Sequence, residues 1–435
     1  EAGKGGTSSA PYSSGENNTA IGYNALKGFT TGHTNVAIGY EAMSAATTAH
    51  DSIAIGYQAL QNGGQDNNIA IGYQAGQNIT SARYNVIIGD SAGGALTTSD
   101  TNENVFIGNS AGRFADADTN AAHYNVYVGS GAGYYMDDGD SNVYIGREAG
   151  KGSGTGNNAT NHVIIGYQAG TSISTGDANV LLGYQAGDAI TTKSGVIAIG
   201  SGAAGAITTT GDYTIAIGYG AMGGAEIGDG NIAIGYQSMQ NANAAGFHRN
   251  IAIGYQTMAN VGSNGPDDNI ALGYTALNDI TTGGYNVGIG SYVLENLTTG
   301  TDNVAVGFVA GRRITGTHNV SIGSYAHDYG YGSTKSIAIG YQSAQYSTGS
   351  FNTFVGYQAG RGGTNSAPFS SGEKNVAIGY QAFDAFTSGY RNTVLGYKAG
   401  TSVTSGYSNV LIGYEAAEVI STGYENVVIG ANPSQ

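Results

Sequence analysis

The sequence predicts an all-β protein, a parallel β-solenoid in which each repeat of the chain forms one coil. The motif Asn-Val-Ala-Ile-Gly-Tyr, or a close variant, occurs twenty-four times. Thirteen of the twenty-three spacings between successive closing glycines are seventeen residues long. The others range from sixteen to twenty-three residues. Charged residues make up only 10% of the chain, against roughly 25% in ordinary globular proteins. A short fixed period of this kind is typical of solenoids, in which each repeat contacts only its neighbours.

The repeat predicts a single continuous solenoid domain over residues 1–435, with about 24 coils of about 17 residues. Residues 1–23 also match residues 358–380, twenty-one coils further along, at seventeen of twenty-three positions. This closer match indicates tandem duplication of a long block. We therefore expect the chain to be a segment of a longer fibre, or to assemble end to end.

The motif itself predicts the first strand of each coil. In all copies the residue three positions before the closing glycine is Val, Ile or Thr. The residue one position before it is Ile, Leu or Val. Alternate residues of a strand share a face, so we expect these two positions to fill the interior. The residue between them then points outward, and an outward apolar row predicts a packing face against another chain or layer. The alternative is that Ala, present there in twelve copies, is simply tolerated on a surface of low charge. The candidate packing face comprises Ala20, Ala37, Ala54, Ala70, Ile87, Phe106, Tyr127, Tyr144, Ile164 and Leu181.

Two polar rows accompany this strand. Asn stands four residues before the glycine in nineteen copies, which predicts an amide ladder along the stack with a spacing of about 4.8 Å. Tyr follows the glycine in fifteen copies. Stacked phenol rings could dock sugar rings, although the favoured interpretation is that they only stabilise the stack. The candidate ligand-contact ladder comprises Tyr23, Tyr40, Tyr57, Tyr73, Tyr167, Tyr184, Tyr236 and Tyr255.

The remainder of each coil predicts a second, shorter strand. An apolar residue seven after the glycine precedes a Thr or Ser pair and a further glycine, as in Ile280-Thr281-Thr282-Gly283. Each coil should then contain two short strands and two turns. Length variation concentrates beyond this element, at residues 115–124, 152–161 and 362–374. Insertions at one point of a repeat lie on one edge of a solenoid, and that edge is often the binding edge.

The repeats resemble those of known surface fibres. Asn68-Ile69-Ala70-Ile71-Gly72-Tyr73-Gln74-Ala75-Gly76 and residues 375–382 are similar to the head repeats of YadA-like trimeric autotransporter adhesins. They look still more like the Gly-Tyr-Gln-Ala-Gly repeats of phage tail fibres and bacterial surface proteins. The adhesin resemblance implies a left-handed parallel β-roll that forms a homotrimer and binds extracellular matrix or receptors. The common coil of this chain is longer than the adhesin coil, and no adhesin binding residue maps onto this sequence.

Little in the sequence points to catalysis or to a cofactor. The seven His residues are scattered singly, with no metal-ligand spacing and no nucleophile motif, so we expect no enzyme activity and no cofactor. Asp137-Asp138-Gly139-Asp140 and Asp66-Asn67-Asn68 carry oxygen ligands that could hold Ca²⁺, although such turns are usually solvated. The net charge of −15 argues against a nucleic-acid partner. No apolar run approaches the roughly 20 residues of a membrane helix, so no membrane insertion is expected.

These observations favour a structural extracellular fibre or adhesin shaft that mediates attachment at a cell or virion surface. Its expected partners are further copies of itself, as a homotrimer or an end-to-end filament, and a surface glycan or extracellular matrix. The alternatives are a matrix filament without a specific receptor, and an ice-binding or carbohydrate-binding solenoid. Ice binding is disfavoured because adjacent Thr side chains point to opposite faces of a strand. Specificity should lie where the copies differ, in the long turns, the bulky block from Ile87 to Leu181 and the Tyr row.

Overall fold

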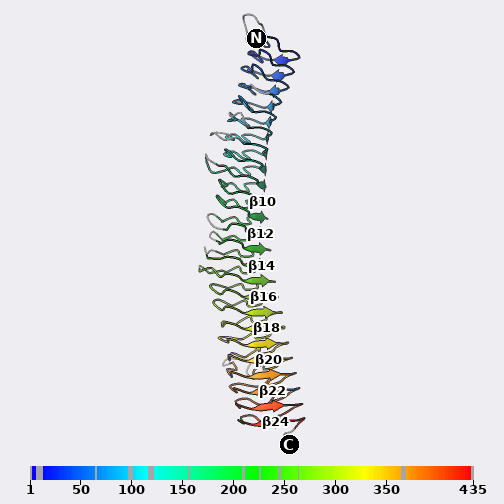
Figure 1. Cartoon of the computed structure of the whole chain (residues 1–435), viewed down its shortest axis with the longest axis vertical. Helices are drawn as coiled ribbons and strands as arrows, with labels where there is room; N and C mark the ends of the chain where they lie inside the picture. Colours follow the sequence, from blue (N-terminus) through cyan, green and yellow to red (C-terminus); the bar gives the residue numbers. More distant parts are fainter. Residues whose placement is uncertain are drawn as a thin grey trace. The chain divides into compact units, whose positions relative to one another are not determined.

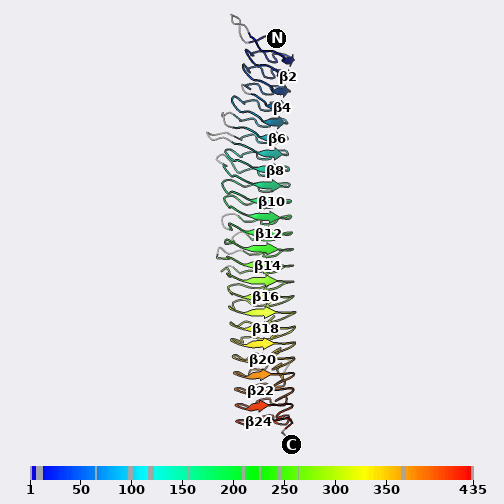
Figure 2. The ribbon, with the colours of Figure 1, turned by 45° about the vertical axis from the view of Figure 1, so that its right-hand side comes forward.

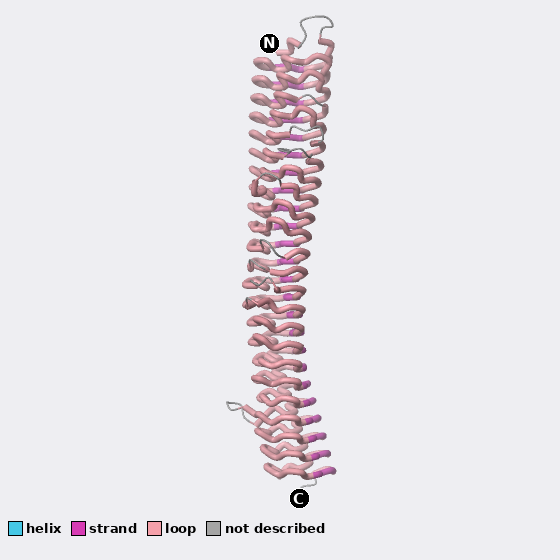
Figure 3. Tube along the Cα trace, turned by 60° about the vertical axis from the view of Figure 1, so that its left-hand side comes forward, coloured by secondary structure: helices cyan, strands magenta, loops and turns pink. Residues whose placement is uncertain are grey.

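A computed structural model describes residues 2–5, 13–63, 66–96, 101–115, 122–154, 157–207, 211–224, 227–242, 246–262, 264–363 and 369–432. The chain divides into two compact units, Glu1–Gly220 and Ala221–Gln435, and each is considered by itself. In the described residues of both units the only regular elements are short strands joined by long turns, with no helix (Figures 1 and 3).

Each coil contributes one strand of three residues, which corresponds to the Val-Ala-Ile part of the motif. In the first unit the strands are β1 (Thr19–Ile21), β2 (Val36–Ile38), β3 (Ile53–Ile55), β4 (Ile69–Ile71), β5 (Val86–Ile88), β6 (Val105–Ile107), β7 (Val126–Val128), β8 (Val143–Ile145), β9 (Val163–Ile165), β10 (Val180–Leu182), β11 (Ile197–Ile199) and β12 (Ile215–Ile217). In the second unit they are β13 (Ile232–Ile234), β14 (Ile251–Ile253), β15 (Ile270–Leu272), β16 (Val287–Ile289), β17 (Val304–Val306), β18 (Val320–Ile322), β19 (Ile337–Ile339), β20 (Thr353–Val355), β21 (Val376–Ile378), β22 (Thr393–Leu395), β23 (Val410–Ile412) and β24 (Val427–Ile429).

Successive strands pair in parallel, with equivalent motif positions opposite one another. Val36 pairs with Ile53 and Ala37 with Ala54, and the same register recurs from coil to coil in both units. Figure 2 shows the strands of each unit lying one above the next. This arrangement confirms the predicted parallel β-solenoid, in which each repeat of the motif forms one coil. The left-handed sense of the coil and its continuity over residues 1–435 stay predictions.

The expected second strand is not formed. Outside the named strands, isolated bridges join Met136 to Asn157 and Ser347 to Ser370. The Ile-Thr-Thr segment instead bends, with few backbone hydrogen bonds between coils, such as Thr281 N to Thr298 O at 2.8 Å. A strand needs several extended residues in succession. Here a glycine and a left-handed residue such as Tyr285 (φ 59°) follow too soon to allow one.

The predicted orientation of the strands is wrong. Nine of the ten residues predicted to form an outward packing face, all except Ala20, have an exposed fraction of 0%. Ala20, in the first strand, is half-buried. In β2 the burial alternates in the opposite sense to the prediction, with Ala37 inside and both Val36 and Ile38 partly exposed. The middle residue of each strand therefore faces the core, and its two aliphatic neighbours face outward.

The interior is too narrow for two large side chains at one level, which explains this orientation. A Cβ atom on Gly133, six residues after the buried Tyr127, would lie 2.5 Å from the Tyr127 ring. Phe106 and Gly112 show the same relation, with a Cβ–ring distance of 2.8 Å. Where the middle residue is Ala, the buried residue six positions later is often large, as in Ala37/Met43, Ala54/Leu60 and Ala377/Phe383. Small residues occupy the middle of the strand because the facing turn fills the core there.

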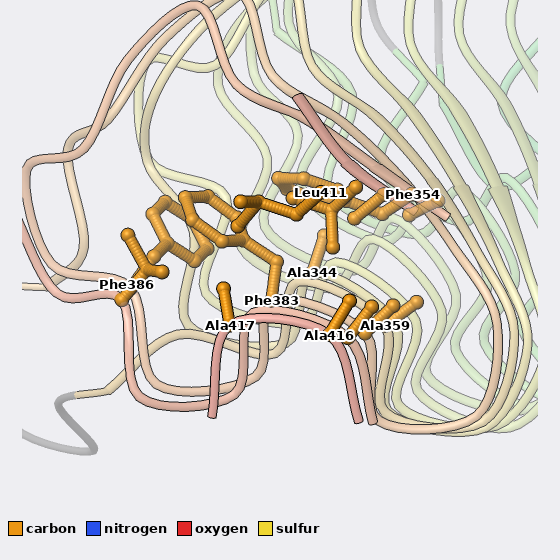
Figure 4. Close-up of a cluster of buried hydrophobic side chains, with 14 of the residues drawn as sticks. Ala344, Phe354, Ala359, Phe383, Phe386, Leu411, Ala416 and Ala417 are labelled. Atoms are coloured by element: carbon orange, nitrogen blue, oxygen red, sulfur yellow. The ribbon is translucent and has the colours of Figure 1, made fainter. Parts of the chain in front are cut away.

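Near the end of the second unit, this packing yields an aromatic cluster (Figure 4). Phe383 stacks on Phe386 with ring centroids 4.9 Å apart, and Phe354 lies 5.4 Å from Phe386. Ala359 and Ala416 belong to the same fully buried cluster. Small side chains on the turns thus make room for aromatic rings from other positions.

Glycine and asparagine hold the corners of the coil. Gly56 has φ 138°, and a Cβ atom there would lie 2.3 Å from the carbonyl oxygen of Gly72 in the next coil. Only glycine permits both that conformation and that approach. Asn286 Nδ2 donates to Asn269 Oδ1 at 3.0 Å, and Asn286 Oδ1 accepts from the backbone N–H of Asn303 at 3.0 Å. Equivalent bonds recur through both units, which confirms the predicted amide ladder.

Candidate functional site

The outer sheet face, formed by the first and third residues of the strands, is apolar although it lies at the surface. Every residue at these positions is Val, Ile, Leu or Thr, with no charge. Ile253, Ile289 and Ile378 have exposed fractions of 37%, 39% and 40%. A continuous apolar surface of this kind indicates an interaction site. The surface that is open to another chain is therefore formed by these two rows and not by the middle row, and its packing against a partner stays a prediction.

The candidate ligand-contact tyrosines stack on one another in three runs. Ring centroids are 5.1 Å apart between Tyr23 and Tyr40, 5.4 Å between Tyr167 and Tyr184, and 5.0 Å between Tyr236 and Tyr255. Tyr57 and Tyr73 extend the first run. All eight rings are 38–59% exposed. The rows are therefore accessible, and their contact with a ligand stays a prediction.

A second aromatic row was missed in the sequence. Tyr390, Tyr407 and Tyr424 stack with centroid distances of 4.9 and 5.1 Å, on the turn that precedes the strand. These tyrosines recur at the seventeen-residue spacing of the repeat, and this regular spacing is the sequence signal that indicates the second row. A glutamine row also links coils beside the first tyrosines, where Gln74 Nε2 donates to Gln58 Oε1 at 3.0 Å.

The first tyrosine row is interrupted beside β5 to β8. In four successive coils another residue stands at the position of Tyr, namely Asp90, Asn109, Ser130 and Arg147. The row resumes at Tyr167. Two surface hollows lie along this gap. One of about 290 Å³ includes Asn109, Ser130 and Arg147 in its lining, and one of about 190 Å³ borders Arg113 and Phe114. We refer to the two hollows together as the gap groove.

Charged groups in the gap groove influence one another. A hydrogen bond from Gln168 Nε2 to Glu148 Oε2, 2.8 Å long, is the main cause that lowers the pKa of Glu148. The nearby cations Lys151 and Arg147 lower it further. Lys151 Nζ lies 3.5 Å from Glu148 Oε1. Glu148 is therefore ionised over the physiological pH range and neutralises part of the positive charge there.

The two candidate Ca²⁺ turns serve mainly in hydrogen bonding between coils. Asp66 Oδ1 accepts from the backbone N–H of His50 at 2.9 Å, and Asp140 Oδ1 accepts from that of His123 at 2.6 Å. Asn68 is buried in the amide ladder. No group of three or more His, Cys, Asp or Glu residues is arranged to hold a metal in the part of the chain that the structure describes.

The histidines are less isolated than the sequence indicates. His33 stacks on His50 with ring centroids 3.9 Å apart, because the two residues occupy equivalent positions in successive coils. His162 and His327 are fully buried. Burial is the main cause that lowers the pKa of each to about 4. His162 takes the place of Asn in the ladder, where its Nδ1 accepts from the backbone N–H of Asn179 at 3.0 Å.

The Thr pairs support the stack through their hydroxyl groups. Thr281 Oγ1 donates to Thr298 O at 2.9 Å, and Thr30 Oγ1 donates to Thr47 O at 3.0 Å. These donors are already used between coils, so no observation favours the ice-binding alternative. The central parts of the three predicted insertions, residues 116–121, 155–156 and 364–368, lie outside the described residues.

The fold and surfaces define the chain as a β-solenoid repeat protein. No family model matches the chain, and no curated protein matches its sequence. Among the described residues there is no helix that is long and apolar enough to span a membrane.

Proposed function

We propose that this chain is a structural extracellular fibre segment or adhesin shaft, without enzyme activity, that self-associates through its outer sheet face. The observation that carries the proposal is the exposed aliphatic surface, which recurs in coil after coil of both units. The resemblance to adhesin head repeats adds that the assembly is a homotrimer. A repetitive shaft would also present many equal contacts to a surface, which favours multivalent attachment.

A second copy of the chain is the partner that best suits the outer sheet face. Each coil offers the same two aliphatic rows with a rise of about 4.8 Å, so a second copy matches them in both chemistry and spacing. The face carries no charged residue, so its burial would not desolvate a charge. Symmetric assembly also allows the same patch to serve on each subunit.

Replacement of three outer residues by lysine tests this proposal. We expect the wild-type chain to show a molar mass of three chains of 43.9 kDa each by light scattering. The variant Ile253→Lys/Ile289→Lys/Ile322→Lys places charges on the outer sheet face and should reduce the mass to that of one chain. A circular dichroism spectrum like that of the wild type would show that the solenoid remains folded.

Lysines on the turns provide the matched control. Gln237→Lys/Gln256→Lys/Gln342→Lys adds the same charge at the coil position where Lys398 occurs naturally. This variant should retain the assembled mass. Self-association through the outer sheet face would be excluded if the wild type were monomeric, or if both variants dissociated equally.

Contact with a carbohydrate through the tyrosine rows is a second candidate function, supported by the exposed and stacked rings. Stacked aromatic faces can contact sugar rings while the hydroxyl groups form hydrogen bonds. We expect Tyr40→Ser/Tyr57→Ser to reduce binding on a glycan array. Equal binding by the wild type and this variant would contradict a role for the first run of the row.

A further inference from the structure

The gap groove differs in shape from the surface where the first tyrosine row is continuous. Elsewhere the residue after the closing glycine is commonly Tyr, whose ring covers the surface beside it. Here the smaller Asn109 and Ser130 stand at that position and leave this surface uncovered. The hollow of about 290 Å³ lies at this point, beside β6 to β8. Its volume is close to the lower limit of about 300 Å³ for small-molecule pockets. The adjoining hollow of about 190 Å³ lengthens it along the stack.

Three aromatic side chains form one wall of the gap groove. Phe114 lines the smaller hollow, and its ring lies 5.2 Å from that of Tyr134 and 5.6 Å from that of Tyr135, which line the larger one. Tyr134 and Tyr135 meet edge to face at 4.5 Å. All three rings are partly exposed. Aromatic faces beside a polar floor of amide and hydroxyl groups suit the apolar face and the hydroxyl groups of a sugar.

Positive charge is concentrated in the gap groove, although the chain as a whole is acidic. Arg113, Arg147 and Lys151 lie at its lining with one carboxylate, Glu148, which pairs with Lys151 and leaves the two arginines in excess; the whole chain has only 15 Lys and Arg residues. Arg113 stacks over Phe114 and Arg147 over Tyr167, each at 5.7 Å. Neither guanidinium forms an ion pair with a carboxylate of the described residues. Both can therefore donate paired hydrogen bonds to a carboxylate or sulfate.

We propose that the gap groove is a binding site for an oligosaccharide that carries carboxylate or sulfate groups. The aromatic wall contacts the sugar rings, Asn109 and Ser130 bond to the hydroxyl groups, and Arg113 and Arg147 bind the anionic groups. The site goes beyond a shaft that self-associates, because its residues lie on the turns and not on the outer sheet face.

Calorimetric titration of the full chain tests the site. The probes are a tetragalacturonate, a heparin-derived tetrasaccharide and neutral galactotetraose. At least one acidic probe should bind about tenfold more tightly than the neutral one, and its affinity should fall as salt rises. The proposal is overturned if neither acidic probe binds at millimolar concentration, or if the neutral probe binds equally well.

Filling the gap gives a sharp second test. Ser130→Tyr restores the residue that is most common at this position, so the fold should tolerate it while the ring blocks the groove. This variant should weaken the acidic probe about tenfold or more, and so should Tyr134→Ala/Tyr135→Ala. Tyr255→Ser opens a gap elsewhere in the row and should leave the affinity unchanged. Unchanged binding by Ser130→Tyr would contradict the site.

The outer-face variant Ile253→Lys/Ile289→Lys/Ile322→Lys separates this inference from the proposed function. Its substitutions lie in the second unit, whereas the gap groove lies in the first. It should bind the acidic probe as the wild type does, even when self-association is lost. Loss of the probe's binding along with assembly would show that the groove does not bind by itself.

Discussion

The amide ladder shows how one side chain supports three coils. Asn286 Nδ2 donates to Asn269 Oδ1 and to Gly300 O at 2.9 Å, while its Oδ1 accepts from the Nδ2 of Asn303 at 3.0 Å. The three asparagine side chains are buried. Removal of the Asn286 side chain takes away the donor to Gly300 O and the acceptor of the buried backbone N–H of Asn303. Each group left without a partner in the core costs about 1–3 kcal/mol.

We therefore expect Asn286→Ala to lower the local free energy of unfolding by about 2–4 kcal/mol. Asn286→Ser is the milder control, because Ser52 and Ser336 occupy the same ladder position naturally. Hydrogen exchange of β15 to β17 would measure both, since a solenoid can open locally. Equal protection in Asn286→Ala and the wild type would show that the ladder contributes little.

The buried His162 should make its neighbourhood sensitive to acid. Burial lowers its pKa in the folded chain to about 4, whereas a His in an unfolded chain titrates near 6.5. The unfolded chain therefore takes up a proton as the pH falls below 6.5, and the folded chain does not. The stability present above that pH is lost progressively toward pH 4, by roughly 3 kcal/mol.

His162→Asn should remove this loss and restore the ladder. We expect the variant to protect the amides of β8 to β10 more strongly than the wild type at pH 4.5, with a smaller difference at pH 7.5. Hydrogen exchange at both pH values would show it. The same difference at both pH values would exclude titration of His162 as the cause.

Within one coil, the size of the strand's middle residue and that of the facing turn are coupled. The narrow interior is filled in two ways: by a large strand residue with a small turn residue, as in Tyr127 with Gly133, or by the reverse, as in Ala54 with Leu60. The turn position has positive φ in both kinds of coil, 58° at Gly133 and 47° at Leu60. A leucine at position 133 would therefore clash with Tyr127 more than it would strain the backbone.

A double-mutant cycle tests this coupling. Gly133→Leu alone should destabilise the surrounding coils by about 2–3 kcal/mol through overpacking. Addition of Tyr127→Ala, which reproduces the Ala54/Leu60 pairing, should recover most of that loss. Local stability from hydrogen exchange would yield the coupling energy. Purely additive losses would mean that the two side chains do not share the space.

The repeat predicted the position, register and parallel pairing of the strands, but not which side of each strand faces the core. Alternation along a strand separates two faces without identifying the buried one. Side-chain size alone favours Val36 and Ile38 for the interior, whereas the interior takes Ala37 because Met43 also lies there. A large residue in the middle of the strand goes with a small one six positions later, as in Phe106 with Gly112. This size relation in the sequence indicates that both positions face the core.

The candidate sites were less predictable than the coil. The Tyr row could be located because one residue type recurs at one position, and the structure stacks Tyr23, Tyr40 and Tyr57 as expected. The gap groove depends on the absence of that residue in four coils and on rings such as Tyr134 from another position. Such a site follows from the folded coil and not from a local motif.

In the whole molecule the middle residue of each strand from β2 to β23 is buried, and we propose that its neighbours face a second copy. Leu181 and Leu182 of β10 provide a matched pair, because they are the same residue type on opposite faces. The chain contains no Cys, so a single introduced thiol can be followed by maleimide labelling. The labelling is compared in the wild-type background and in the outer-face lysine variant.

We predict that the thiol of Leu181→Cys is unreactive in both backgrounds, because the core encloses it. The thiol of Leu182→Cys should be protected in the assembled chain and should react rapidly once the lysine substitutions separate the copies. Rapid labelling of Leu181→Cys with protection of Leu182→Cys in both backgrounds would contradict the orientation of the strands. Equally rapid labelling of Leu182→Cys in both backgrounds would contradict self-association through the outer sheet face.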